Sequence, residues 1–210
     1  MHRMRSVQLL VSFFVVSLVV VGAINIEHNI NLHRPKPDDA EAMARWLVAF
    51  SSWGVLSTLS IHLGGAPWGN IASFSDGPKG KATGTPYFYL SRMDPTPVDI
   101  EQDARCSLSL SEAPIGTCGS RDVEDPTCAR LTLSGKMVEL AKGCEEGKFA
   151  LKALFSKHPE MAVWPKGHDW RVYKLKIEDI FLVDFYGGAK EMSVEDYYNA
   201  AEPSISDSSS

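Results

Sequence analysis

Basic residues are scarce in this sequence. Lys and Arg together number 21 against 26 Asp and Glu, which gives a formal net charge of −5. A protein that binds nucleic acid neutralises phosphates with a positive face, and this sequence has no basic cluster that would form one. The composition therefore excludes a nucleic-acid partner.

Catalytic signatures are also missing. The sequence contains no Gly-x-Ser-x-Gly elbow, no Walker loop, no Gly-x-Gly-x-x-Gly after a strand and no His-Glu-x-x-His pair. His62, His158 and His168 are isolated, so each is expected to be a surface or core histidine rather than a base or a ligand. We therefore predict no catalytic, cofactor-binding or metal-ligating residues.

Long hydrophobic runs are absent except at the N-terminus. Arg3 and Arg5 precede an apolar stretch over 9–21, and small residues follow at Val21-Gly22-Ala23. This stretch is shorter than the ~20 residues of a transmembrane helix. Residues 1–23 are thus predicted to be a cleaved secretory signal peptide, with an uncleaved anchor as the weaker alternative. We expect a secreted, extracellular or endomembrane-lumen protein that has no membrane segment after cleavage.

The spacings typical of zinc ligands, Cys-x-x-Cys and Cys-x-x-His, do not occur. The four cysteines are Cys106, Cys118, Cys128 and Cys144. An even number in an exported chain favours disulfides, and three pairings are possible. Cys118 and Cys128 enclose nine residues whose Gly, Ser, Asp and Pro content is typical of a loop. Closing that ring would stabilise the fold by about 3 kcal/mol in the chain-entropy view.

The remaining chain is predicted to form one domain. Residues 24–37 form an irregular arm, residues 38–200 carry the apolar periodicity, and the serine-rich tail 201–210 has almost nothing to bury and is predicted to be disordered.

Two main helices and about six strands are expected. Apolar residues recur at helical spacing after Asp38, the expected N-cap, and again over 145–157, while 94–103 reads as a shorter helix. The helices interrupt the strands rather than alternate with them, which favours an α+β, predominantly β fold with an antiparallel sheet or barrel. The strands are expected over 55–61, 70–75, 86–90, 106–111, 130–135, 170–177 and 180–185.

Three segments could bind a ligand. The glycine-rich loop 76–84 could hold a phosphate through its amides and its two lysines, although a solvated loop is the simpler interpretation. Tyr87-Phe88-Tyr89 could stack on a flat ligand, but in a strand such residues more often pack on both faces of the sheet. The aromatic and proline residues between Phe155 and Trp170 suit a rigid interface element as well as a pocket.

Several blocks of residues form a recognisable pattern of order and spacing: Trp53–Thr58, Ser73–Gly77, Gly84–Leu90, His158–Met161 with Trp164-Pro165, and Asp184–Lys190 with Tyr197-Tyr198. In both order and spacing they resemble the secreted CREG family, the cellular repressors of viral-oncoprotein-stimulated genes. The similarity runs from about Arg34 to Asn199. Cys118 and Cys128 also fall where that family places a disulfide, whereas Cys106 and Cys144 are not part of its pattern in animals.

The resemblance implies a six-stranded antiparallel FMN-binding split barrel with flanking helices, like that of the pyridoxamine-phosphate oxidases. It also implies a homodimer, secreted or in a lysosome or vacuole, that regulates growth and differentiation without a cofactor, with a protein receptor as a further possible partner. The chain departs from the family in having no Asn-x-Ser/Thr sequon, so sorting through N-linked glycans is not expected.

Two function classes follow. The first is a non-catalytic interaction protein, and the alternative is an FMN-dependent oxidoreductase of the pyridoxamine-phosphate oxidase-like split-barrel type. A flavin would supply the redox chemistry itself, so the missing motifs do not exclude the enzyme. The basic residues available for a flavin phosphate are few: Lys79, Lys81, Arg105 and Arg130. This scarcity favours the non-enzymatic interpretation.

The expected homodimer has a second argument besides the resemblance. Tyr87, Phe88 and Tyr89 place large side chains on both faces of one strand, and Trp164, Trp170 and Phe185 add more apolar surface. Two substantial helices would not cover all of it, and a twofold interface is the commonest solution.

Overall fold

The computed structural model describes residues 33–203. The predicted signal peptide 1–23, most of the arm 24–37 and most of the tail 201–210 therefore lie outside the described residues. Within the described part, no helix is long and apolar enough to cross a membrane.

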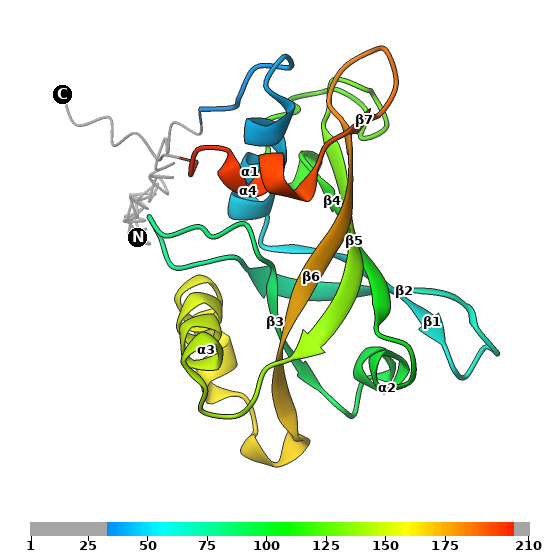
Figure 1. Cartoon of the computed structure of the whole chain (residues 1–210), viewed down its shortest axis with the longest axis vertical. Coiled ribbons are helices and arrows are strands. Elements are labelled where there is room, and N and C mark those ends of the chain that lie inside the picture. The colour runs from blue at the N-terminus through cyan, green and yellow to red at the C-terminus, as the bar shows by residue number, and fades with distance from the viewer. Residues whose placement is uncertain (1–32, 204–210) are drawn as a thin grey trace, which may run out of the picture.

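The strands form one antiparallel sheet that closes on itself (Figure 1). The strand order is β3-β2-β1-β4-β5-β6-β7, and β3 also pairs with β6, so the first six strands make a ring. This arrangement confirms the predicted α+β, predominantly β class and the ring of six antiparallel strands. The strands are β1 (Trp53–Ser60), β2 (Ala66–Ser75), β3 (Tyr87–Ser91), β4 (Arg105–Ser111), β5 (Arg130–Glu139), β6 (Trp170–Val183) and β7 (Lys190–Glu191).

β6 corrects the prediction of two separate strands over 170–177 and 180–185. It runs unbroken past Glu178, because the register with β5 shifts there: Ser134 pairs with Asp179, whereas Gly135 pairs with Ile177. The extra residue forms a β-bulge, which bends a strand without ending it. β2 is longer than predicted in a similar way, since it starts at Ala66 inside the expected turn.

Within residues 33–203, four α-helices flank the ring: α1 (Ala40–Phe50), α2 (Pro95–Gln102), α3 (Glu145–Lys157) and α4 (Val194–Asn199). Three short 3₁₀ helices accompany them: η1 (Ala113–Ile115), η2 (Pro159–Val163) and η3 (Lys166–His168). α3 has the predicted bounds. The N-cap of α1 is Asp39 rather than Asp38, because the Asp39 side chain accepts the Ala42 N–H at 3.1 Å, the reach that an N-cap requires.

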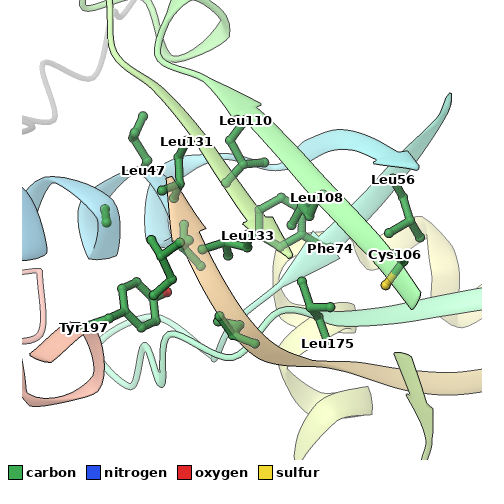
Figure 2. Close-up of a cluster of buried hydrophobic side chains, with 14 of the residues drawn as sticks. Leu47, Leu56, Phe74, Cys106, Leu108, Leu110, Leu131, Leu133, Leu175 and Tyr197 are labelled. Atoms are coloured by element: carbon green, nitrogen blue, oxygen red, sulfur yellow. The ribbon is translucent and has the colours of Figure 1, made fainter. Parts of the chain in front are cut away.

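Alternate residues of each strand fill the ring (Figure 2). Leu56, Leu108, Leu133 and Leu175 are fully buried there, and Tyr197 of α4 joins the same cluster. Burying one such leucine contributes roughly 2 kcal/mol.

Residues of β3 pack into two separate hydrophobic cores. Phe88 belongs to the ring interior, whereas Tyr87 packs against α3, where its ring meets Phe149 edge-on at 5.9 Å. Tyr89 likewise meets Phe155 of α3 at 5.7 Å. The chain's own helix thus covers the aromatic residues of β3 that were expected to need a second subunit.

Candidate functional site

The four cysteines divide into one disulfide and two thiols. Cys118 and Cys128 are joined, while Cys106 and Cys144 are free within the described residues. Burial raises the pKa of Cys106 to about 12, so this thiol is no nucleophile at neutral pH. The Cys144 sulfur caps α3 by accepting the Gly147 N–H at 3.2 Å. Cys106 is therefore a core residue, and Cys144 is the N-cap of α3.

His62, His158 and His168 do not lie together in the structure. His158 is buried, and its Nε2 lies 3.0 Å from the carbonyl oxygen of Phe74. His168 lies beside the Trp170 ring, and His62 is exposed. In the part of the chain that the structure describes, no group of three or more His, Cys, Asp or Glu could hold a metal ion.

The loop 76–84 does not have the form of a phosphate cradle. The Asp76 side chain turns inward and accepts the Gly84 N–H at 3.1 Å. The Ala82 N–H, which would have to face a phosphate, donates to the Glu202 carboxylate at 2.7 Å. The Asp76 carboxylate and the Ala82 and Gly84 N–H groups are thus occupied by hydrogen bonds within the protein.

The four basic residues considered for a flavin phosphate lie apart. Arg105 pairs with Lys136 at one end of the β4–β5 ladder, and Arg130 pairs with Ser111 at the other, about 20 Å away at the rise of a strand. Arg105 is also occupied by Asp103, whose carboxylate accepts its Nε–H at 3.0 Å. Lys79 and Lys81 are exposed in the loop 76–84. The four residues do not fit one flavin phosphate.

A cavity of about 700 Å³ lies beside α3. Its floor is formed by Tyr89 of β3 and Val172 of β6, one wall by α3 residues such as Leu151, and the other wall by Trp164 and Trp170. In Figure 1 these elements, α3 and the ends of β3 and β6, lie together at one end of the barrel. We call this cavity the aromatic groove.

Three aromatic rings pack against one another in the groove. The Tyr89 and Trp170 rings are 5.1 Å apart and inclined by 21°, and the Trp164 and Trp170 rings are 4.8 Å apart and inclined by 34°. Such offset stacks are a favourable arrangement of aromatic rings. The Trp170 Nε1–H donates to the Pro165 carbonyl oxygen at 2.8 Å, which fixes the orientation of the indole. The aromatic segment noted in the sequence, 155–170, therefore builds one wall of a cavity.

The rim of the groove carries four basic side chains. Arg171 is neutralised by Glu139 at 3.0 Å and Asp169 at 3.2 Å. Lys148 pairs with Glu145. Lys142 and Lys166 have no acidic partner within ion-pair distance among residues 33–203. Sequence reasoning missed Lys142, because it follows β5 and nothing in its own neighbourhood relates it to Trp164.

The phenol and carboxylates that line the groove are protonated or paired. Burial raises the pKa of the Tyr89 phenol, so this group stays protonated at neutral pH. The carboxylates of Glu139 and Asp169 are taken up by Arg171. No free acid–base pair lies among the residues that line the groove.

A second surface lies on the outside of the ring. Strand pairing places five outward-facing residues in one row, in the order Ile71, Val55, Ser109, Thr132, Phe181. At its ends Ile71 is 61% exposed and Phe181 43% exposed. We call these residues the outer row.

The comparison with known families decides the identity of the chain. Residues 35–199 match the family described as CREG, beta-barrel. The chain belongs to the CREG family. It is 41% identical to human protein CREG2 over 170 residues, which cover 79% of this chain and 58% of that protein. It is 39% identical to chicken protein CREG1 over 171 residues, which cover 79% of this chain and 88% of that protein.

Solved structures share the fold of this CREG-family chain at low identity. The heme binding protein from Mycobacterium smegmatis has a TM-score of 0.63 and 22% identity, covering 79% of this chain and 61% of that one. HutZ, the heme storage protein from Vibrio cholerae, has a TM-score of 0.51 and 16% identity, covering 72% and 96%. These likenesses concern the split-barrel architecture alone.

Proposed function

We propose that the chain is a non-catalytic interaction protein of the secretory route, located outside the cell or in an endomembrane lumen such as that of a lysosome or vacuole. It acts as a homodimer and regulates growth or differentiation through a protein receptor. Membership of the CREG family supports this function. The disulfide between Cys118 and Cys128 supports an oxidising compartment.

The outer row is the observation that carries the proposal. Ile71 and Phe181 leave large exposed apolar side chains on the outer face of the ring, with Val55, Ser109 and Thr132 between them. The helices α2 and α3 contact β1, β2 and β6, yet Ile71 and Phe181 stay exposed beside them. Large exposed apolar side chains are typical of a protein–protein interface, and a twofold dimer is the commonest way to cover them.

The flavin-dependent oxidoreductase remains the alternative function. The separation of Arg105 from Arg130 and the occupation of Arg105 by Asp103 weigh against it. A flavin without a phosphate clamp would lose the charge-assisted contacts that anchor it.

Light scattering on the full chain without its predicted signal peptide tests the dimer. We expect twice the monomer mass at micromolar concentration, and a monomer when Ile71→Glu and Phe181→Glu are combined. Val123→Glu is the matched control, because Val123 is 59% exposed in the disulfide loop and lies outside the outer row. A monomeric parent protein, or a dimer that the double variant leaves intact, would contradict the proposed interface.

Absorbance and thermal melting test the alternative. We expect a colourless protein without the flavin band near ~450 nm, and no rise in Tm when FMN is added. A yellow preparation, or a Tm that climbs with FMN concentration as a native-state ligand requires, would support the oxidoreductase instead.

A further inference from the structure

The aromatic groove adjoins the outer row, because Ile71 lines a smaller neighbouring cavity together with Tyr89, Trp164 and Trp170. Its cavity of about 700 Å³ lies within the range of small-ligand sites, ~300–1,000 Å³. Trp164, Trp170 and Tyr89 are half-buried, so each leaves part of a ring in contact with solvent. Side chains held in this way lose little conformational entropy when a ligand binds.

We propose that the aromatic groove binds an acidic oligosaccharide, a sugar chain that carries sulfate or carboxylate groups. The inference takes from the proposed function only its compartment, where such sugar chains are displayed.

The aromatic rings of the groove are the reason to expect a sugar as the ligand. One face of a pyranose ring presents C–H groups and packs as an apolar surface against a flat aromatic ring. The Trp164, Trp170 and Tyr89 rings are mutually inclined by 16° to 34° with centroids 4.8 to 6.3 Å apart, so they stack on one another and leave part of their faces, which are half-buried, open to a sugar. The Trp170 indole, which donates to the Pro165 carbonyl oxygen, is fixed within this stack.

The lysines at the rim of the groove are the reason to expect acidic groups on the ligand. Lys142 and Lys166 both line the groove, one after β5 and the other in η3. Because the chain has a net charge of −5, a pair of unneutralised lysines at one cavity is a local reversal of sign. Such a reversal selects an anionic ligand and speeds its encounter.

An acidic peptide fits the same charges but cannot add a strand there. Strand addition, one mode of peptide recognition, requires a free sheet edge. Beneath the groove, β3 and β6 are paired with each other from Tyr87 to Ser91, so this mode is not available. A peptide would have to bind through side-chain contacts alone, and the titration below compares it directly with the sugar.

Tryptophan fluorescence gives a direct assay, since Trp164 and Trp170 both line the groove. The full chain without its signal peptide would be titrated with a heparin-derived tetrasaccharide at 50 mM and 300 mM salt. Cellotetraose is the uncharged probe of the same length, tetra-glutamate the acidic peptide, and FMN the flavin. We expect saturable binding of the heparin fragment, weakened by salt because exposed charges are screened, and weak or no binding of the other three.

Variants then test the groove itself. Combining Lys142→Glu with Lys166→Glu should weaken binding about tenfold, because each exposed charge contact contributes roughly a factor of two to five. Lys176→Glu is the control for charge reversal outside the groove, since Lys176 is exposed on β6 and does not line the cavity, and it should bind as the parent does. Trp164→Ala should weaken both the heparin fragment and any residual cellotetraose binding.

Three results would overturn the proposal: no binding of the heparin fragment at 50 mM salt, equal loss in the Lys176→Glu control, or tighter binding of tetra-glutamate or FMN than of the sugar. Tm measurements on each variant separate loss of binding from loss of folding. Light scattering reports the dimer independently, so failure of the groove and failure of the proposed function are distinguishable.

Discussion

The Glu112 carboxylate accepts two hydrogen bonds from the Arg34 guanidinium, at 2.7 Å from Nε and 3.0 Å from Nη2. Glu112 is fully buried. It also accepts the Ala129 N–H at 2.8 Å and the Thr117 hydroxyl at 2.8 Å. One carboxylate thus connects the N-terminal arm to both ends of the disulfide-bonded segment.

These contacts predict a pH-dependent contribution to stability. Burial alone would raise the pKa of Glu112, but the hydrogen bonds from Arg34, Ala129 and Thr117 outweigh it and lower the pKa below 4.5. A lowered folded-state pKa gives stability that is complete above the unfolded value and is lost as pH falls through the folded one. Glu112→Gln should therefore cost about 3 kcal/mol at pH 7 and less near pH 3.

Urea unfolding at both pH values measures that difference. Glu124→Gln is the control, because Glu124 is exposed in the disulfide loop and should change the free energy of unfolding little. An equal cost of Glu112→Gln at pH 7 and pH 3 would contradict the proposed charge contribution.

The disulfide should contribute a comparable amount. Replacing Cys118 and Cys128 together with serine removes a cross-link across a sequence separation of 10 and should lower the free energy of unfolding by about 3 kcal/mol. Cys144→Ser is the control, since serine also accepts the N-cap hydrogen bond. If the double variant unfolds at the same urea concentration as the parent, the bond has no stabilising role.

Local signals explain which elements the sequence could predict. α3 was predicted at 145–157 because its apolar spacing and acidic first turn lie within the helix itself. β6 was not, because the bulge at Glu178 depends on how β5 pairs with it. Asp38 and Asp39 are adjacent candidates for one cap, and only the backbone geometry distinguishes them.

The candidate site likewise combines features that the local sequence shows with features that depend on the tertiary fold. The aromatic residues between Phe155 and Trp170 were visible as a cluster in the sequence, but their cavity depends on the approach of Leu140 and Gly147 from other segments. Arg45 sits in a helix as a surface arginine would, yet it is 4% exposed. Composition could not show that its guanidinium bonds to carbonyl groups far along the chain.

Gly135 should tolerate no side chain. A Cβ at this position would lie 2.0 Å from the Lys176 carbonyl oxygen, so the bulged β5–β6 pairing would have to shift. Gly135→Ala should cost about 3 kcal/mol, within the range of backbone strain and lost packing. Gly167→Ala is the matched control, because its Cβ would meet nothing within 4 Å. Similar thermal melts for both variants would contradict the close approach.

The C-terminal segment should restrain the loop 76–84. The Ala82 N–H donates to Glu202 at 2.7 Å, and its carbonyl oxygen accepts from Arg45 at 2.9 Å, so charged side chains fix both backbone polar groups of one residue. Lys81, exposed beside it, is a trypsin site. Cleavage of a native protein requires local opening, and its rate follows the free energy of that opening.

Because the Ala82–Glu202 bond is exposed, its loss should cost about 1 kcal/mol. Glu202→Ala should therefore speed cleavage after Lys81 about fivefold by mass spectrometry. Glu195→Ala, which alters an exposed carboxylate of α4 without a contact to the loop, should leave the rate unchanged. Equal rates in the parent and Glu202→Ala would mean that Arg45 alone restrains the loop.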